Sequence, residues 1–233
     1  MATHDMATHY DIVHFSEVGS TQDEAARRFD TTGVPTLVVA DRQIAGRGRQ
    51  GRRWQQPDQA MFSSLSFATD WEPRHRTLIP LIAGSVVCEV IGDVGRRAPS
   101  LKWPNDILID RAKVGGVLVE ADGDHLTVGC GLNLWWADPI EGATSVFDKD
   151  VDSTLALNLA KRWARALLYE IDGPSGEWRK DRYVEMSATL GHEVVWDGGM
   201  GTAAGLTASG ALIVDTPRGR EIIHAGDVHL RSS

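Results

Sequence analysis

Short apolar runs alternate with amphipathic stretches along the first 186 residues, and this alternation predicts an α+β fold. Strand patterns cover residues 10–15, 36–40, 61–67, 100–103, 107–109, 114–120 and 126–134. Helical spacing, with apolar residues recurring at i, i+3 and i+4, covers residues 21–29, 79–94, 155–171 and 178–183. Because short turns join several of these strands, we expect a mixed, largely antiparallel sheet covered by helices.

Two helix starts carry residues that favour an N-cap. Ser20 precedes the acidic residues Asp23 and Glu24, which favour the first turn of a helix, so Ser20 is the expected cap of the first helix. Ser153 or Thr154 is the expected cap of the helix over 155–171.

The pattern changes from about residue 191, where helical spacing gives way to short strands and glycine-rich turns. Strand patterns there cover residues 193–196, 201–206, 211–214 and 221–223. They predict a small β-barrel or sandwich appended to the larger domain. We therefore expect a domain over residues 1–186 and a second, small one over 187–233.

Composition narrows the class of protein. A hydrophobic content of 42% and a charged content of 24% are typical of a soluble globular chain, and no run predicts a membrane span. The first residues lack the features of a secretory signal, so a cytoplasmic location is expected. The two cysteines and eight histidines show no metal-ligand spacing, and neither a disulfide framework nor a resident metal ion is predicted.

Positive charge gathers in one segment, although the net charge is −8. Residues 46–54 read Gly-Arg-Gly-Arg-Gln-Gly-Arg-Arg-Trp, and glycine lets backbone N–H groups approach an anion closely. A solvated loop without a ligand is the ordinary explanation of a charge run. Adjacent arginines repel each other, however, and a bound anion relieves that repulsion. We interpret the segment as a site for a small ligand that carries a phosphate or carboxylate.

The same segment matches the dinucleotide fingerprint G-x-G-x-x-G, but its context does not. A dinucleotide-binding loop opens a helix whose N-terminus faces the pyrophosphate, whereas residues 52–57 have no apolar periodicity and end at Pro57. The chain also has no Walker A sequence.

Two further blocks combine a polar turn, a lysine and glycines within strands. Residues 102–106 read Lys-Trp-Pro-Asn-Asp, and residues 113–120 begin at Lys113 and contain two glycines. Residues 129–131 repeat the small-residue pattern on the next strand. A glycine inside a strand often marks the close approach of a ligand, although a plain hairpin with an exposed lysine explains the spacing equally well.

Taken together and in this order, the four blocks at residues 46–54, 102–106, 113–120 and 129–133 closely resemble the biotin protein ligases. Ser20-Thr21-Gln22 is similar to the family's opening Ser-Thr-Asn signature, with Gln22 in the place of the usual asparagine. The resemblance spans about residues 10–230. It implies the fold shared by class II aminoacyl-tRNA synthetases and biotin ligases, followed by an SH3-like C-terminal β-barrel. Too few residues precede Tyr10 for the DNA-binding domain of the repressor members, so the ligase without repressor function is expected.

The resemblance also implies the site residues, which fall into three groups. The biotin-binding group is Ser20, Thr21, Gln22, Gln43, Gly46, Arg47, Gly48, Arg49, Lys113, Gly115, Gly116 and Gly131. The ATP-binding group is Arg49, Arg52, Trp54, Asn105, Lys113 and Asn133. The catalytic group is Lys113, Arg47, Arg49 and Asp106, with Lys113 matching the family's essential lysine.

The activity that the resemblance implies is the ATP-dependent formation of biotinyl-5′-AMP and transfer of biotin to a carrier lysine. Two anions, the biotin carboxylate and the ATP α-phosphate, repel each other unless fixed cations lie between them. Arg47, Arg49 and Lys113 supply that charge, with Mg²⁺ on the triphosphate. We expect residues 45–56 to be mobile without ligand and to close over the adenylate.

The expected acceptor is the biotin carboxyl carrier domain of acyl-CoA or pyruvate carboxylases, and the protein itself is expected to be a monomer or a weak homodimer. Lipoate or octanoate transfer on the same fold is one alternative. A protein that senses biotin or a nucleotide, or a nucleic-acid binder that uses the C-terminal β domain, is another. The acidic balance argues against nucleic acid, and neither DNA nor a membrane is an expected partner.

Overall fold

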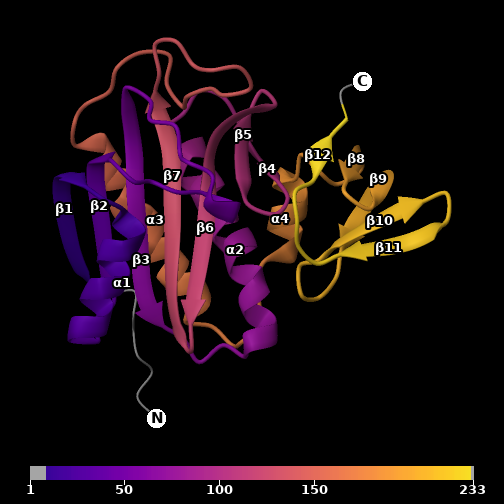
Figure 1. The fold of residues 1–233 in the computed structure, drawn as a ribbon, viewed down its shortest axis with the longest axis horizontal. Coiled ribbons are helices and arrows are strands. Elements are labelled where there is room, and N and C mark those ends of the chain that lie inside the picture. Colours follow the sequence, from indigo (N-terminus) through magenta and orange to yellow (C-terminus); the bar gives the residue numbers. More distant parts are fainter. Residues whose placement is uncertain (1–8, 232–233) are drawn as a thin grey trace.

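A computed structural model describes residues 9–231. They form a seven-stranded sheet in the order β1-β2-β3-β7-β6-β5-β4 and a five-stranded sheet in the order β11-β10-β9-β8-β12 (Figure 1). The predicted α+β fold, with a mixed sheet and a small C-terminal β structure, is confirmed.

The large sheet and its helices occupy residues 11–186. The strands are β1 (Asp11–Val18), β2 (Thr36–Gln43), β3 (Gln59–Ala68), β4 (Pro99–Lys102), β5 (Asp106–Ile109), β6 (Ala112–Asp122) and β7 (His125–Trp135). The helices are α1 (Thr21–Thr32), α2 (Ile79–Gly92), α3 (Leu155–Ile171) and α4 (Lys180–Met186), with short 3₁₀ turns at Arg49–Gly51 and Pro73–Leu78.

Only the β1–β2 pair of the large sheet is parallel among the described residues, because α1 carries the chain across between these strands. The other neighbours pair antiparallel. Helix α1 packs on β2, β3 and β7, while α3 packs on β2 and β3 and α2 on β4, β5 and β6. Figure 1 shows α1 in front of the sheet and α2 and α3 behind it.

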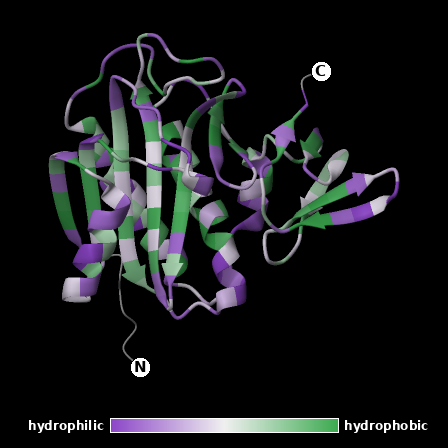
Figure 2. Ribbon diagram, in the orientation of Figure 1, coloured by the Kyte–Doolittle hydropathy of each residue, from purple (hydrophilic) through white to green (hydrophobic). Residues whose placement is uncertain are grey.

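The main core lies between the sheet and helices α2 and α3. Trp163 and Leu167 of α3 are fully buried, as are Ile79 and Ala83 of α2. Residues 73–92 are long and apolar enough to cross a membrane by those two criteria alone, but two thirds of the segment is buried inside the protein, as expected for a core helix. Figure 2 shows hydrophobic residues along the central strands and hydrophilic ones on α1.

The C-terminal sheet contains β8 (Glu193–Trp196), β9 (Gly199–Leu206), β10 (Leu212–Thr216), β11 (Gly219–Ile223) and β12 (His229–Leu230). Backbone contacts join it to the large domain, since the Ala188 N–H donates to the Leu101 carbonyl at 2.8 Å. The Trp103 indole N–H also donates to the Gly210 carbonyl at 2.9 Å. This antiparallel sheet is consistent with the expected SH3-like domain.

The structure bears on the two predicted helix caps and adds one strand. Ser20 is the N-cap residue of α1, as predicted, but its side chain makes no capping bond; its hydroxyl accepts from Arg47 at 3.3 Å. Thr154 is the N-cap residue of α3, but its side chain makes no capping bond; instead, the Asp152 carboxylate accepts from the Thr154 backbone N–H at 2.8 Å. Strand β12 was not expected, since two residues carry no periodicity.

Candidate active site

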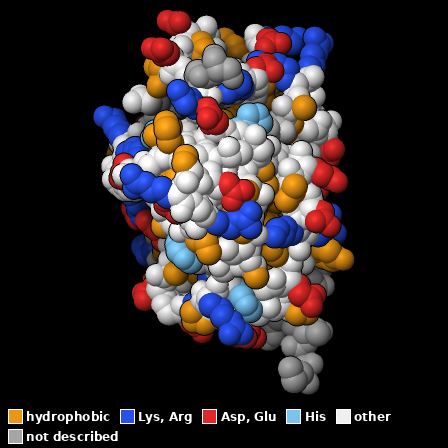
Figure 3. Space-filling view, turned by 90° about the vertical axis from the view of Figure 1, so that its right-hand side faces the viewer, with side chains coloured by type: hydrophobic (Ala, Val, Ile, Leu, Met, Phe, Trp, Pro, Cys, Tyr) orange, Lys and Arg blue, Asp and Glu red, His pale blue; other side chains and the backbone are white. Residues whose placement is uncertain are grey.

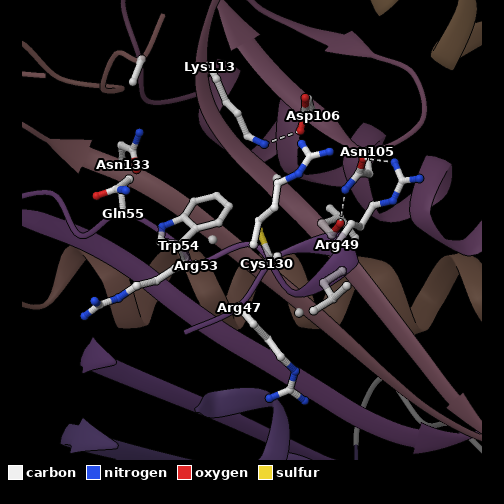
Figure 4. Close-up of a pocket in the computed structure, with 18 of the residues that line it drawn as sticks. Arg47, Arg49, Arg53, Trp54, Gln55, Asn105, Asp106, Lys113, Cys130 and Asn133 are labelled. Atoms are coloured by element: carbon white, nitrogen blue, oxygen red, sulfur yellow. Dashed lines mark hydrogen bonds and ion pairs between the residues drawn. The ribbon is translucent and has the colours of Figure 1, made fainter. Parts of the chain in front are cut away.

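A cavity of about 330 Å³ opens above the sheet, a size suited to a small molecule. Its walls come from the start of α1, the Gly/Arg loop (residues 46–54), strands β3, β6 and β7, and the β4–β5 turn. Residues 140–143 and the C-terminal segment 227–229 complete the rim. The fold thus brings together the blocks that the sequence keeps far apart (Figure 4).

One end of the cavity is neutral and is held by hydrogen bonds around Thr21. The Gln43 amide oxygen accepts from the Thr21 backbone N–H at 2.7 Å and from its hydroxyl at 3.0 Å. The Thr21 hydroxyl also lies 2.9 Å from the Ser64 hydroxyl of β3. Thr21 and Ser64 are buried, so these bonds compensate for the lost contact with water. We call Thr21, Gln22, Gln43 and Ser64 the neutral end.

Gln22 extends this network to the sheet. Its amide nitrogen donates to the Thr127 carbonyl of β7 at 2.9 Å, and its amide oxygen accepts from the Ser64 hydroxyl at 3.0 Å. The amide oxygen lies only 2.5 Å from the position that a Cβ on Gly129 would take. The Gln22 side chain is therefore held directly against the backbone of Gly129.

Two glycines form a floor under the middle of the cavity. Gly116 of β6 and Gly131 of β7 are directly paired across the sheet. The Trp54 ring lies on them, since Cβ atoms added there would stand 3.5 Å and 3.0 Å from it. Within residues 9–231 the indole N–H of Trp54 is buried without a hydrogen-bond partner. The flat Trp54 ring thus packs on a part of the sheet where glycines leave the backbone uncovered.

The other end of the cavity is charged and is centred on Asp106. The Lys113 ammonium donates to one Asp106 oxygen at 2.5 Å, and the Lys102 ammonium lies 3.5 Å from the other. Lys113 Nζ is also 5.6 Å from the Trp54 ring centroid. Figure 4 shows Lys113 and Asp106 pointing toward each other across the cavity. We call Lys102, Asp106 and Lys113, together with Arg49, the charged end.

Arg49 connects this end to the C-terminal sheet. Its guanidinium donates to the Asn105 amide oxygen and to the Gly226 carbonyl, both at 3.1 Å. Burial lowers the pKa of Arg49, because the charged form loses water. Arg52 forms an ion pair with Asp227 next to this contact. The Gly/Arg loop therefore spans both parts of the fold.

Arg47 points in a different direction. It donates to Asp23 of α1 at 2.7 Å and to Glu120 of β6 at 2.9 Å. Hydrogen bonds to these two carboxylates raise the pKa of Arg47. In Figure 4 its guanidinium lies away from Lys113. The structure thus does not bring Arg47 to the charged end.

Asn133 and the loop after it form the wall beside Lys113. The Asn133 amide donates to the Thr144 carbonyl at 2.9 Å, and Asn133 is buried. The backbone of Lys113 bonds to that loop on both sides, since its N–H donates to the Gly142 carbonyl at 2.8 Å and its carbonyl accepts from Thr144 at 2.9 Å. The position of Lys113 is therefore coupled to residues 140–144.

Most residues that the sequence nominated line this cavity, but two do not. Gly46 packs against the Gln43 side chain, where an added Cβ would stand 3.0 Å from the amide nitrogen. Gly115 faces the core because successive strand residues point to opposite faces, and a Cβ there would stand 2.5 Å from Leu132. The nominated lining residues are Ser20, Thr21, Gln22, Gln43, Arg47, Gly48, Arg49, Arg52, Trp54, Asn105, Asp106, Lys113, Gly116, Gly131 and Asn133.

Sequence reasoning missed Ser64, Lys102 and Asp227 as cavity residues. Ser63-Ser64 is a polar pair inside an otherwise apolar strand, a signal that would have marked Ser64. Asp227 gave no such signal, since only the tertiary fold brings the C-terminal segment to the Gly/Arg loop. Among residues 9–231, no group of three His, Cys, Asp or Glu residues has the arrangement of a metal site.

Comparisons with known proteins agree with this geometry. The biotin/lipoate A/B protein ligase family model matches residues 15–133, and the model of the biotin protein ligase C-terminal domain matches residues 188–231. The chain therefore belongs to the biotin/lipoate A/B protein ligase family. Relatives matched over most of their length include proteins named as biotin ligases.

Among these relatives, the biotin–[acetyl-CoA-carboxylase] ligase of Mycobacterium tuberculosis is 31% identical, over 93% of this chain and 88% of its own. The bifunctional ligase/repressor of Escherichia coli is 27% identical, over 93% of this chain and 73% of its own. The solved biotin protein ligase of Aquifex aeolicus, in complex with biotin and ATP, superimposes with a TM-score of 0.78 at 30% identity, covering 96% of this chain and 99% of that one.

Proposed function

We propose that this protein is an ATP-dependent biotin protein ligase. It activates biotin as biotinyl-5′-AMP and transfers the biotinyl group to a lysine of a biotin carboxyl carrier domain. The observation that carries the proposal is the polarity of one cavity, which is neutral and hydrogen-bonded around Thr21 and cationic around Lys113. Biotin has the matching polarity, a neutral cyclic urea at one end and a carboxylate at the other.

We assign the neutral end to the urea ring. Thr21, Gln43 and Ser64 provide hydroxyl and amide groups, which suit a ligand with two N–H donors and one carbonyl acceptor. Gly116 and Gly131 make room for the flat Trp54 ring, which we assign as an apolar wall beside the bicyclic ring. Ser20 and Gly48 close the side of this compartment.

We assign the charged end to the reacting groups. In the first step, a biotin carboxylate oxygen attacks the α-phosphorus of ATP, a P–O bond forms, and pyrophosphate leaves. Lys113 and Arg49 stabilise the negative charge in this step. Mg²⁺ bound to ATP would neutralise the triphosphate, and Asp106, which accepts from Lys113, would orient that ammonium or the metal ion. We assign Arg52, Trp54, Asn105 and Asn133, which line the same cavity, to the nucleotide.

In the second step, the neutral ε-amine of the acceptor lysine attacks the acyl carbon. The C–O bond to AMP breaks, an amide forms, AMP leaves, and the proton lost by the amine passes to water. The mixed anhydride must be kept from water until the carrier arrives. We propose that the Gly/Arg loop provides this cover, and that Arg47 is its outer anchor through Asp23 and Glu120.

The remaining assignments follow from this reaction. We propose residues 1–186 as the catalytic domain and 187–233 as a C-terminal domain that supports the Gly/Arg loop through Gly226 and Asp227. The acceptors are carrier domains of acyl-CoA or pyruvate carboxylases, and the protein acts in the cytoplasm as a monomer or weak homodimer. Acidic and basic side chains are interspersed on the face that includes the C-terminal sheet, which argues against DNA as a partner (Figure 3).

Incubation with ATP, Mg²⁺, biotin and a carrier-domain protein tests the proposal. The expected result is a carrier mass increase of one biotinyl group, dependent on ATP and on the acceptor lysine. Lipoate and octanoate are tested in parallel. Modification by either of these acids but not by biotin would contradict the assignment, and so would binding of biotin without adenylate formation or transfer.

A further inference from the structure

The Gln22 side chain fills the space that a side chain at position 129 would need, so the two residues share one place in the cavity wall. The Gln22 amide oxygen lies 2.5 Å from the place of a Cβ on residue 129, a separation shorter than any relaxed contact. Alanine at 129 and glutamine at 22 therefore exclude each other in this arrangement. We propose that the pair sets the depth of the neutral end, with Gln22 as a positioning residue for the ring of the substrate.

The backbone gives no other reason for a glycine at this position. Gly129 is not among the described residues with a positive φ, so an L-amino acid fits its conformation. It lies in the middle of β7, directly paired with Ser64 on one side and Leu118 on the other. What requires glycine here is the Gln22 side chain above it.

Hydrogen bonds prevent Gln22 from moving aside at low cost. Its amide oxygen accepts from Ser64 and its amide nitrogen donates to the Thr127 carbonyl, so both polar atoms are used. The residue is 4% exposed, and a displaced amide would leave these buried partners without a bond. Ser64 in turn contacts Thr21, the residue bonded to Gln43. A shift of Gln22 is thus transmitted to the groups proposed to meet the ring.

This inference rests on the proposed function for the identity of the ligand, but its steric part stands without it. Gln22→Asn removes one methylene from the wall, and Gly129→Ala adds one carbon at the same place. The double variant conserves the number of carbon atoms, and volume-conserving exchanges are the best tolerated. A double-mutant cycle therefore measures the coupling directly.

The experiment compares the wild type, Gln22→Asn, Gly129→Ala and the double variant. Thermal unfolding without ligand is the first measurement, and the biotin KM and kcat for pyrophosphate release are the second. Gly205→Ala on β9 is the control, since no atom lies within 4 Å of a Cβ there. We expect it to behave as wild type in both measurements.

We expect Gly129→Ala to lower the Tm by several degrees and to raise the biotin KM at least about tenfold, with kcat at saturating biotin changed less than about threefold. Gln22→Asn raises KM by about two- to fivefold. The double variant returns to within about threefold of Gln22→Asn in KM and recovers most of the lost Tm. If Gly129→Ala does not fold, recovery of a folded, active double variant supports the pair equally.

Additive effects in both measurements would overturn the inference, as would a double variant that is no better than Gly129→Ala. Coupling in Tm without coupling in KM would show a packing role alone and would overturn the positioning role. A wild type that releases no biotin-dependent pyrophosphate would instead contradict the proposed function, and the Tm cycle would still decide whether the two residues share one position.

Discussion

The two ends of the cavity are built by different physical means. At the neutral end, Thr21, Gln22 and Ser64 are buried and bonded to one another and to Gln43 and Thr127. At the charged end, the Lys113 side chain is 43% exposed and is held through its ion pair with Asp106. Burial fixes the first end before any ligand arrives, whereas the ion pairs of the second can be exchanged for the anions of a ligand.

This difference separates two kinds of consequence. Removing a group from a buried network leaves partners unpaired and lowers the stability of the fold. Removing an exposed charge costs little stability, because water and salt screen it in the free protein. The same charge is worth far more beside a reacting anion from which water is excluded. Variants at the neutral end should therefore lose stability in unfolding assays, whereas variants at the charged end should lose activity in rate assays.

The largest effect is expected for Lys113→Ala at the charged end. Adenylate formation should fall by about 10²–10³-fold, the loss typical of removing one stabilising group at a developing charge. The Tm should change little. Biotin-dependent pyrophosphate release measures the rate, and Lys149→Ala, a change at an exposed lysine, is the matched control. Adenylation near the wild-type rate would remove Lys113 from the reaction.

Ser64→Ala tests the neutral end. The variant leaves the Gln22 amide oxygen and the Thr21 hydroxyl without their shared partner. We expect a loss of about 1–3 kcal/mol in the free energy of unfolding, with a higher biotin KM and a nearly unchanged kcat. Urea unfolding measures the first quantity. Ser153→Ala, at an exposed serine, is the control, and equal stability of the two variants would show that the network is not coupled.

Asp106→Asn should produce an intermediate effect, because it removes the charge that holds Lys113 and Lys102 but keeps the shape of the side chain. We expect about a tenfold loss of adenylation, equivalent to about 1.4 kcal/mol. Transfer from preformed biotinyl-5′-AMP, measured separately, shows which step depends on the carboxylate. Full activity in both steps would exclude a role for Asp106.

The smallest effect is expected for Arg47→Ala, which breaks the exposed pairs with Asp23 and Glu120. The free energy of unfolding should change by less than about 1 kcal/mol, and less again at high salt. Hydrogen exchange should nevertheless be faster in residues 45–56 of the variant, and in the ligand-free wild type it should be faster there than in β7. Equal protection of the loop and β7 would contradict the proposed mobility.

Local patterns predicted most of the fold because its strands and helices are regular. The turn at residues 104–105, between strands over 99–102 and 106–109, was readable from the Pro-Asn-Asp sequence alone. The cap of α3 was readable only as Ser153 or Thr154, because both are good capping residues and only the folded geometry places Thr154 at the N-cap position. Two residues of β12 carry too little pattern for any sequence argument.

The sequence predicted which segments line the site, but not the directions in which their side chains point. The sequence marked Arg47 and Arg49 alike, yet Arg47 turns toward the carboxylates of α1 and β6 while Arg49 turns toward Asn105. Gly115 and Gly116 are neighbours in sequence, but strand alternation sends one to the core and the other to the cavity. Side-chain direction depends on partners from distant segments, and those partners are visible only in the folded chain.

A crystal structure of the complex with a non-hydrolysable biotinyl-5′-AMP analogue decides whether the cavity holds the ligand in the proposed orientation. We predict the urea ring within hydrogen-bond distance of Thr21, Gln43 or Ser64, and the acyl-phosphate within that distance of Lys113. A ligand bound in the reverse orientation, with its ring beside Asp106 and its phosphate beside Thr21, would exclude these assignments, as would a ligand bound outside the cavity.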